Sequence, residues 1–543
     1  MAIVDSTERR SSKPRKKGLA TFETALCETK FGKFNYILIF LSGVILANVL
    51  LETLGISFVL PVAQCDLKLT TQKKGILHSI GFAGIITSSH LWGFLADTKG
   101  RRKVILPTLV SGFIASFLSS FSNEFWSMVI FRYINGFFVS GGSATIYAYL
   151  GEFHTAKTRS RAIMGASVIF GMGAMVLPLL AMAILNYEWS FHIDLLGIDY
   201  KPWRLLIVVL GLPGLLSALC LYQLPESPKF VLSIGKEEES LNILKNIFAI
   251  NTGKDKDEFS IITIAPDLES TIQRQNIPNL KSNPLTFVCK SMWNQTVPLF
   301  SKEFVRKTIL ACTIQFSIFF TSNGMYMWFP FILNTMMEYS KNHPGQSVKM
   351  CDVVHEKLLK LPIGETLEDD SELTCSGKLE IDTFLHSLTL EVMYSVGFAI
   401  IGFIINTIGK LPILFFIMTG CGLCGIASIY VTTPIIAVYL YIVLLVCGLA
   451  IAVVNAATVD LYPTHLRAMA ICISLMFGRL GSAVGANVVG SILDYSCEGT
   501  FYVSGLTLIL GGFLGFLIPK PPENMELRSR ESSLVSMTGN SPP

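Results

Sequence analysis

Residues 93–103 read GFLADTKGRRK and separate two apolar runs of the chain, Ile76–Ala96 and Val104–Phe121. Gly100 allows a tight turn there, because glycine adopts a positive φ without a steric penalty. Asp97 can meet the positive N-terminal end of a facing helix, and the arginines can bridge to acidic partners. A plain cytoplasmic loop would explain the cations, but not the placement of the Asp and the Gly. The segment therefore indicates a specific turn between two membrane helices.

The composition indicates that the chain spans a membrane many times. Of its 543 residues, 51% are hydrophobic and only 15% are charged, whereas soluble chains carry about 25% charged residues. The hydrophobic residues form runs long enough to cross a hydrocarbon core of about 30 Å as helices. We expect an all-α membrane protein with about twelve transmembrane helices, over Tyr36–Val62, Ile76–Ala96, Val104–Phe121, Phe125–Leu150, Ala162–Leu185, Leu205–Leu224, Thr308–Met336, Thr389–Ile408, Leu411–Val431, Ile435–Leu461, Ala468–Leu493 and Phe501–Ile518.

Lys and Arg residues are concentrated in alternate short loops, and cytoplasmic loops carry such an excess. This distribution places both termini and the central segment in the cytoplasm, and the loop 338–386 in the lumen or outside the cell. We expect the central segment to form short amphipathic helices that cover the cytoplasmic face. The expected domains are a tail (1–35), a six-helix bundle (36–224), a central loop (225–307), a second six-helix bundle (308–518) and a second tail (519–543).

An internal repeat indicates two matched halves. The end of the second expected span reads DTKGR at residues 97–101, and the end of the eighth reads NTIGK at residues 406–410, 309 positions further on. A second pair of charged residues recurs with the same seven-residue spacing: Glu152 with Arg159, and Asp460 with Arg467, 308 positions further on. Two independent matches at nearly one offset favour parallel six-helix halves.

Residues 93–103 resemble the loop signature of the major facilitator superfamily. The resemblance continues through Arg132–Gly136, Gly151–Phe153 and Pro225–Phe230, the last of which is similar to the marker that closes the first half of sugar-porter-like members. Finer details resemble the synaptic vesicle glycoprotein 2 branch, next to organic ion transporters: Phe58–Pro61, Gly141–Ser143, Glu188–Phe191 and Trp328–Pro330. The resemblance implies a transporter whose two bundles rock about a central solute site, and it does not name the solute.

Charged residues inside the spans are the strongest functional candidates, because their burial in lipid is costly. Glu52 lies about 16 residues, or ~24 Å, into the first span, and Arg132 lies about 6 residues into the fourth, which enters from the opposite side. The two can therefore meet at similar depth. Relatives of the sugar-porter type use such a pair for coupling, so the resemblance implies that Glu52 exchanges a proton or counters a cationic solute while Arg132 tunes its pKa. The alternative is a static ion pair between two helices. His78 is expected to be a packed core residue.

Two further groups are candidates for the solute site. Arg479, near the middle of the eleventh span, could hold an anionic group of the solute, or pair with an acid or a carbonyl of a neighbouring helix. Trp328 and Asn323 belong to a cluster in the seventh span, where Gly324 and Pro330 allow a break in the helix. This cluster could form a gate or a wall of the cavity, or a lipid-facing aromatic belt at the outer interface.

The cytoplasmic turns hold a candidate gate. Ion pairs there could latch the outward-facing state and break during rocking, or they could serve folding alone. The candidate gate residues are Gly93, Asp97, Gly100, Arg101, Arg102, Glu152, Arg159, Asp460 and Arg467.

Most of the 12 cysteines lie in apolar runs, where Cys behaves as a small hydrophobic residue. Cys351 and Cys375 instead share the loop 338–386, on a side of the membrane where disulfides persist. We expect a bridge between them, the alternative being two free thiols. No cysteine spacing resembles a metal site.

The function that these features favour is secondary active transport of a small organic solute, an organic ion or a polar metabolite, by alternating access. No P-loop is present, so energy would come from protons or another ion gradient. No enzyme activity, cofactor, metal or nucleic-acid partner is expected, because no nucleophile–base or metal set converges. The rival is a non-transporting protein of a vesicle or plasma membrane that uses the scaffold to bind a partner or regulate trafficking. Val49, where the vesicle glycoproteins carry an acid, leaves room for this rival.

Overall fold

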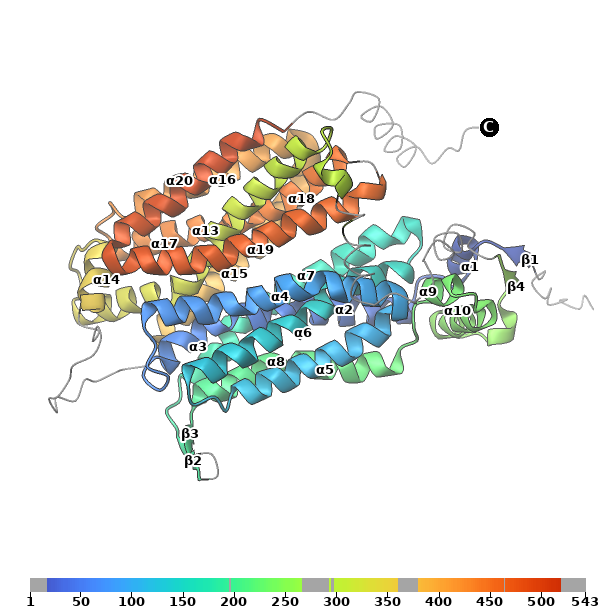
Figure 1. Ribbon diagram of the computed structural model, residues 1–543, viewed down its shortest axis with the longest axis horizontal. Coiled ribbons are helices and arrows are strands. Elements are labelled where there is room, and N and C mark those ends of the chain that lie inside the picture. Colours follow the sequence, from blue (N-terminus) through green and yellow to red (C-terminus); the bar gives the residue numbers. More distant parts are fainter. Residues whose placement is uncertain are drawn as a thin grey trace, which may run out of the picture.

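The computed structural model describes residues 17–194, 197–265, 293, 297–359, 379–462 and 464–518. Its long helices form two bundles that lie side by side, one from each half of the sequence (Figure 1). The N-terminal bundle contains α2 (Lys33–Leu54) continued by α3 (Ile56–Ala63), α4 (Thr71–Lys99), α5 (Arg101–Ser119), α6 (Phe125–Glu152), α7 (Ala156–Leu185) and α8 (Pro202–Gln223). The C-terminal bundle contains α13 (Val305–Asn342), α15 (Ile381–Ile408), α16 (Lys410–Ser428), α17 (Pro434–Leu445) continued through η3 (Val446–Leu449) into α18 (Ala450–Leu461), α19 (Thr464–Tyr495) and α20 (Cys497–Gly515).

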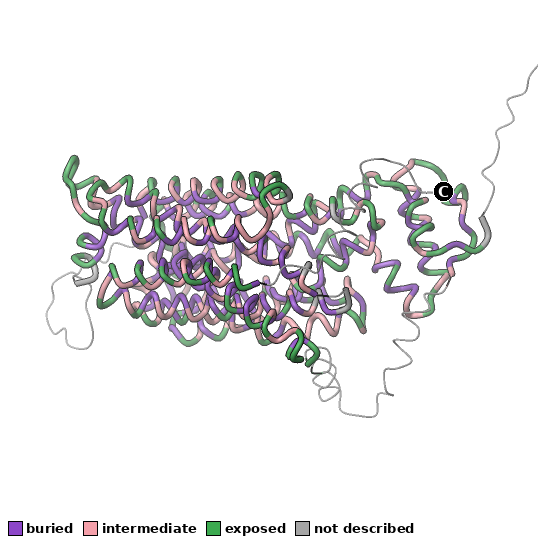
Figure 2. Tube along the Cα trace, turned by 90° about the horizontal axis from the view of Figure 1, so that it is seen from above, coloured by how far each residue is buried: buried purple, intermediate pink, exposed green. Residues whose placement is uncertain are grey.

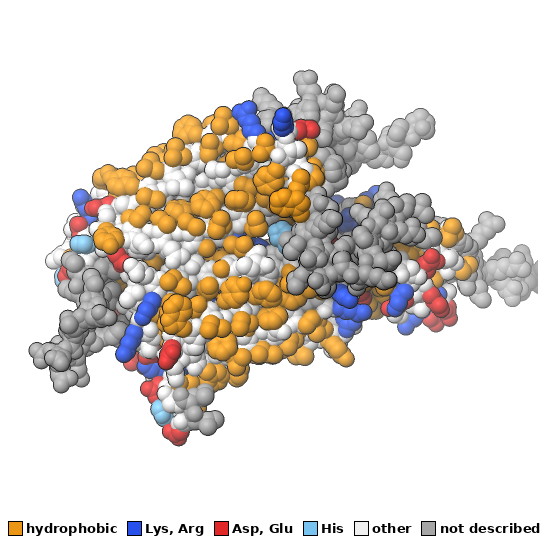
Figure 3. Space-filling model, viewed as in Figure 1, with side chains coloured by type: hydrophobic (Ala, Val, Ile, Leu, Met, Phe, Trp, Pro, Cys, Tyr) orange, Lys and Arg blue, Asp and Glu red, His pale blue; other side chains and the backbone are white. Residues whose placement is uncertain are grey.

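Ten helical spans in the described part of the chain are long and apolar enough to cross a membrane. The helices α6 and α13 are more polar, but α6 packs along α4 and α5, and α13 packs along α19 and α20. The described helices thus support a polytopic helical protein, and the count of twelve spans stays a prediction. Exposed hydrophobic side chains such as Phe403, Phe416 and Leu510 cover the flanks of the bundles, while charged side chains gather toward the ends (Figure 3). The buried residues lie between the helices (Figure 2). This distribution is that of a polytopic helical membrane protein.

The repeat seen in the sequence is also present in the backbone. Gly100 separates α4 from α5 with a φ of 113°, and Gly409 separates α15 from α16 with a φ of 93°. A side chain is strained at such a φ, so both turns require glycine. The two halves therefore use one turn, 309 positions apart, to join their second and third spans.

Close helix contacts in the N-terminal bundle depend on glycines, which have no side chain. A Cβ atom added at Gly136 of α6 would lie 2.1 Å from the carbonyl oxygen of Gly81 in α4, and one added at Gly84 of α4 would lie 2.4 Å from the carbonyl oxygen of Tyr133. The backbones of α4 and α6 thus touch, as small residues allow between membrane helices.

Replacing Gly136 with valine should separate α4 from α6. Overpacking of this kind costs about 1–3 kcal/mol or more, and here the clashing atom is backbone that cannot rotate away. We expect Gly136→Val to lose the monodisperse peak in size-exclusion chromatography. Gly402→Val is the control, because a Cβ atom at Gly402 meets nothing within 4 Å. A monodisperse Gly136→Val protein with the melting temperature of the wild type would show that this contact is not as tight as described.

A small subdomain packs on one end of the N-terminal bundle (Figure 1). It joins part of the expected N-terminal tail to the central segment, where α9 and α10 are the short helices that the sequence predicts. Strand β1 pairs with β4 in parallel. The elements are β1 (Lys17–Ala20), α1 (Phe22–Glu28), α9 (Pro228–Ser233), α10 (Glu237–Thr252), η1 (Lys256–Glu258) and β4 (Ile261–Ile264), with η2 (Val297–Phe300) before α13.

Asn251 at the end of α10 connects this subdomain to the first span. Its side-chain nitrogen donates to the carbonyl oxygens of Thr29 and Lys30, and its oxygen accepts from the backbone nitrogen of Phe34. Nearby, the side-chain nitrogen Nδ2 of Asn35 lies 3.1 Å from the ring nitrogen Nε2 of His154, a residue that lies between α6 and α7. Burial lowers the pKa of His154, so the ring is neutral at pH 7 and can accept this hydrogen bond.

At the opposite end, β2 (Phe191–Ile193) and β3 (Ile198–Tyr200) form an antiparallel hairpin, and α14 (Met350–Leu359) covers α20. Here the predicted Cys351–Cys375 bridge is wrong. Cys351 of α14 is bonded to Cys497, the first residue of α20, with their Cα atoms 5.3 Å apart. Packing of α14 on α20 brings together two cysteines that are 146 positions apart in the sequence. Cys375 lies outside the described residues.

Candidate functional site

The predicted pairing of Glu52 with Arg132 is present inside the N-terminal bundle. Nη1 of Arg132 lies 3.7 Å from Oε2 of Glu52, and Nη2 of the same arginine donates to the Glu52 carbonyl oxygen. Ser116 of α5 donates a hydrogen bond of 2.8 Å to Oε2. Glu52 is only 2% exposed and Arg132 is 4% exposed. Three helices, α2, α5 and α6, thus hold a buried pair of opposite charges.

The buried pair has unsatisfied hydrogen-bonding atoms. Within the described part of the chain, Oε1 of Glu52 and Nε of Arg132 form no hydrogen bond of ordinary geometry, and neither ring nitrogen of His78 forms one. His78 is 1% exposed and its ring lies 5.4 Å from that of Phe82, so it is the packed core residue that the sequence predicts. Other buried charged groups of the described chain also have such atoms, for example Nε of Arg204 and Oε2 of Glu152. The burial of two opposite charges inside one bundle therefore marks the candidate site, because such burial is costly.

Glycines shape the space around Glu52. A Cβ atom at Gly211 of α8 would lie 2.7 Å from Oε1 of Glu52, so only glycine leaves room for the carboxylate there. Gly55 joins α2 to α3 one turn beyond Glu52, and its φ of −59° is helical, so the two helices form one span. Phe58 of α3 stacks on Phe384 of α15, with ring centroids 6.1 Å apart. The acid therefore lies close to the helix that reaches the C-terminal bundle.

The predicted cluster on α13 is buried in protein. Trp328 is 2% exposed, and its ring nitrogen donates to the carbonyl oxygen of Ala486 in α19. Asn323 donates to the hydroxyl of Ser482 in α19, with a distance of 2.9 Å. The interpretation of Trp328 as part of a lipid-facing belt is therefore wrong, because these contacts bind α13 to α19. Helix α13 continues without interruption from Val305 to Asn342.

A buried acid of the C-terminal bundle was missed by the sequence reasoning. Glu391 of α15 is 5% exposed, and the hydroxyl of Tyr326 in α13 donates a hydrogen bond of 3.1 Å to its Oε1. The predicted span began at Thr389, which placed this acid at a membrane boundary. The helix begins at Ile381, so Glu391 lies about ten residues, or ~15 Å, along it. The first turns of α15 contain several polar residues, so the hydropathy pattern placed the start of the predicted span too late.

Several contacts join the two bundles. Arg479 of α19 donates a hydrogen bond of 3.0 Å to the hydroxyl of Ser89 in α4, so its partner is neither an acid nor a carbonyl. Near the start of α4, the ammonium of Lys74 lies 5.0 Å from the ring centroid of Phe331 in α13 and donates to Gln64. Together with the stacked Phe58 and Phe384, these residues join the bundles at the ends that the sequence predicts to face outward.

The turn at Gly100, which the sequence predicts to be cytoplasmic, is held by ion pairs within the N-terminal bundle. Nη2 of Arg101 lies 3.0 Å from Oδ1 of Asp97 and 3.1 Å from Oε1 of Glu152. Glu226, after α8, accepts hydrogen bonds from the backbone nitrogens of Arg102 and Lys103 at the start of α5.

The other candidate gate residues are arranged as follows. Arg159 donates to the carbonyl oxygen of Gly151, at the end of α6. A Cβ atom at Gly93 would meet nothing within 4 Å, so its position in α4 is open. The side chains of Asp460 and Arg467 lie outside the described residues, which leaves the matching turn of the C-terminal half as a prediction.

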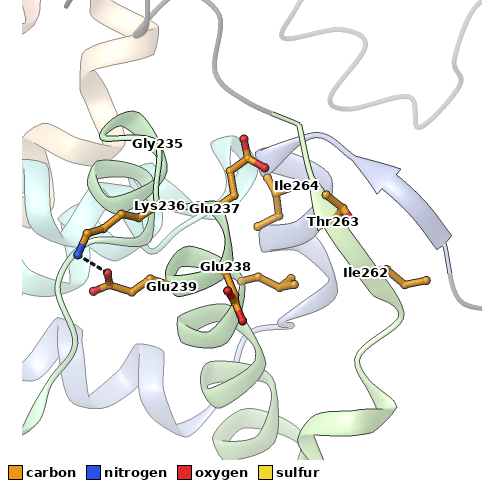
Figure 4. Close-up of a pocket in the computed structure, with 9 residues that line it drawn as sticks. Gly235, Lys236, Glu237, Glu238, Glu239, Ile262, Thr263 and Ile264 are labelled. Atoms are coloured by element: carbon orange, nitrogen blue, oxygen red, sulfur yellow. Dashed lines mark hydrogen bonds and ion pairs between the residues drawn. The ribbon is translucent and has the colours of Figure 1, made fainter.

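A hollow of about 600 Å³ lies in the small subdomain, between the start of α10 and β4 (Figure 4). In it Lys236 pairs with Glu239 at 2.7 Å, and Glu237 and Glu238 line the wall. It contains none of the residues that the sequence singled out for the solute, and it lies away from the bundles. The Glu52–Arg132 pair remains the candidate site.

Comparison with known proteins agrees with this architecture. The chain is 26% identical over 386 residues to human synaptic vesicle glycoprotein 2B, covering 69% of this chain and 55% of the relative. It is 27% identical over 361 residues to rat synaptic vesicle glycoprotein 2A, covering 63% of this chain and 48% of the relative. The chain thus spans about half the length of the curated relatives it matches.

The fold also matches solved transporters. A D-xylose-proton symporter superposes with a TM-score of 0.59 at 14% identity, covering 90% of this chain and 98% of the other. The nucleoside transporter NupG superposes with a TM-score of 0.55 at 12% identity, covering 90% of this chain and 100% of the other. The family model described as Major Facilitator Superfamily matches residues 34–350 and 383–541. By this match and its repeated turn, the chain belongs to the Major Facilitator Superfamily.

Proposed function

We propose that the chain is a secondary active transporter that moves a small organic solute, an organic ion or a polar metabolite, by alternating access and with proton coupling. One observation carries this proposal: the Glu52–Arg132 pair, two opposite charges buried between α2, α5 and α6. Membrane proteins rarely keep such charges inside a bundle without a functional reason. The similarity to a D-xylose-proton symporter supports proton coupling, and the vesicle glycoproteins support an intracellular vesicle membrane as one location, beside the plasma membrane, with both termini cytoplasmic.

The geometry supplies a route from protonation to movement. While Glu52 is ionised, it holds Arg132 and Ser116 and so fixes α2 to α5 and α6. Protonation removes the charge and weakens the attraction to Arg132. Because α2 and α3 form one span, α3 can then move with α2. Phe58 on α3 touches the C-terminal bundle, so its displacement loosens the outer contact.

The experiment that tests the function is uptake by purified protein in liposomes. A mixture of isotope-labelled organic ions and polar metabolites is offered with and without an inward proton gradient, and the contents are identified by mass spectrometry. We expect at least one solute to accumulate, and to accumulate further with the gradient. Liposomes without protein are the control. If no solute of the mixture enters faster than in the control, the result contradicts transport of these solutes and favours the rival function, partner binding.

We propose that the cytoplasmic turn acts as a gate with Arg101 as its centre. Its ion pairs lie within the N-terminal bundle here, and in this proposal they hold the turn in the shape that meets the C-terminal bundle in the outward-facing state. The carboxylate of Asp97 is 74% exposed, so its removal should leave the fold intact. An exposed ion pair contributes about 0.2–1 kcal/mol. Asp97→Asn should therefore raise the inward-open population by up to about fivefold, measured as faster labelling of a cysteine placed at His90 by an impermeant maleimide from the cytoplasmic side.

The control for this gate is Asp199→Asn, because Asp199 lies in the β2–β3 hairpin at the opposite end of the bundle. It should leave the labelling rate unchanged. Equal rates in wild type and Asp97→Asn would assign the Arg101 ion pairs to folding.

A further inference from the structure

The two bundles each bury one acid, and the two acids differ in their surroundings. Glu52 has the guanidinium of Arg132 at 3.7 Å. Glu391 has the neutral hydroxyl of Tyr326 at 3.1 Å, and no Lys, Arg or His of the described chain forms an ion pair with it. The positive charge that would balance Glu391 is therefore not supplied by the described protein.

An unpaired carboxylate in the interior of a membrane protein is costly. A hydrogen bond from one phenol offsets only part of the loss of hydration, because a carboxylate accepts several hydrogen bonds in water. The cost is removed either by a proton on the carboxyl group or by a bound cation that pairs with the carboxylate. The position of Glu391 thus favours a positive group that comes and goes.

Tyr326, which contacts Glu391, belongs to a cluster of aromatic rings that is suited to an organic cation. The ring of Tyr326 stacks on Phe329 with centroids 6.4 Å apart, and Phe329 meets the ring of Tyr441 at 5.2 Å. The hydroxyl of Tyr441 donates to the carbonyl oxygen of Met325, which holds the ring in place. The faces of fixed aromatic rings attract cations.

Glu391 also lies on the helix that borders the N-terminal bundle, because α15 packs against α7. One turn further, the hydroxyl of Ser395 donates to the carbonyl oxygen of Glu391. That hydroxyl lies 3.7 Å from where a Cβ atom of Gly171 in α7 would be. In the other direction along α15, Phe384 stacks on Phe58 of α3. Glu391 is thus placed between two contacts of the bundles, where an alternating-access solute would pass.

We propose that Glu391 and Tyr326 form the binding site for the positively charged group of the solute, and that the solute is an organic monocation. This rests on the proposed function for the path of the solute and adds its charge class. Glu391 supplies the opposite charge, and Tyr326 fixes the orientation of the carboxylate. Arg132 already balances the charge of Glu52, so Glu52 needs no cationic solute and keeps the role of exchanging the proton. The two acids therefore have different roles.

The test is equilibrium binding to the purified full-length protein in detergent at pH 8. The probes are two radiolabelled permanent cations, 1-methyl-4-phenylpyridinium and tetraethylammonium, and neutral 4-phenylpyridine serves as a competitor. Permanent cations have no proton to give, so their binding reports charge alone. The matched variants are Glu391→Gln and Asp382→Asn, because Asp382 is an exposed acid on the same helix.

We expect wild type and Asp382→Asn to bind at least one of the cations with the same Kd, and Glu391→Gln to bind it at least roughly tenfold more weakly, as loss of one charge-assisted contact implies. Neutral 4-phenylpyridine should not compete. Tyr326→Phe keeps the ring and should weaken binding less. If Glu391→Gln does not fold, the Tyr326→Phe variant provides the test instead. A Tyr326→Phe protein with the Kd of the wild type would then overturn the proposal.

An unchanged Kd in a folded Glu391→Gln protein, or a wild type that binds neither cation, overturns this proposal. Proton-driven uptake of a neutral or anionic solute would then leave the transporter function standing. Binding of a cation through Glu391 without any uptake would have the opposite meaning, because the site would stand while the transport function would fall.

Discussion

Uptake by the Glu52→Gln variant should not respond to a proton gradient, although the variant should still exchange solute across the membrane. Gln keeps the shape of Glu52 and its hydrogen bond from Ser116, but it cannot take up or release the proton. Coupling between two ligands of one protein commonly changes affinity by about 5–150-fold, so the gradient should stimulate the wild type by a factor in this range. The measurement is initial uptake into liposomes at several external pH values, with the solute found by the screen.

The pH profile distinguishes coupling from scaffolding in this variant. If Glu52 only joins helices, Glu52→Gln should change the amount of folded protein and leave the shape of the profile as in the wild type. Ser116→Ala is the control, because it removes a neighbour of the carboxylate without removing the titrating group. A Glu52→Gln protein with the pH profile of the wild type would contradict the coupling role.

Arg132→Met should be the most destabilising of the substitutions in the site. It removes the one cation beside a 2% exposed carboxylate and keeps most of the apolar stem. Breaking a buried pair from one side commonly costs about 3–5 kcal/mol, because the other charge is left without compensation. The loss should be larger at pH 8 than at pH 5, since a protonated Glu52 has no charge to compensate. Thermal unfolding in detergent at both pH values measures it.

The double variant Glu52→Gln with Arg132→Met should recover much of that loss. It removes the second charge as well, so no uncompensated ion remains in the bundle. If the double variant is as unstable as the sum of the single variants, the two side chains do not interact as described, and the pair cannot be the centre of the site.

The positions of Glu52 and Arg132 could be predicted because helix geometry converts sequence position into depth. A rise of about 1.5 Å per residue and opposite entry sides were enough to place the two at one level, and the structure pairs them. The turn at Gly100 could be predicted for a related reason, because a glycine at a short loop has few conformational alternatives.

The features that the sequence did not predict depend on contacts between distant segments. Cys351 was assigned to the nearest cysteine of its loop, whereas packing of α14 on α20 selects Cys497. Glu391 was assigned to a boundary because hydropathy alone set the start of α15, and hydropathy does not detect the polar first turns of a long helix. The burial of Trp328 depends on α19, whose face toward α13 no local pattern shows.

The central claim is that the bundles rock about the buried charges, and paired distances measured by electron spin resonance test it most directly. The spin labels are placed on α4 and α13, at Gln72 and Lys341 for the outer ends and at Lys99 and Arg306 for the inner ends, after replacement of Cys27, Cys220, Cys289, Cys424 and Cys472. Between pH 8 and pH 5 the outer distance should increase while the inner distance decreases, and Glu52→Gln should show one fixed distribution at both pH values. Outer and inner distances that stay constant, or that change in the same direction, would contradict the account.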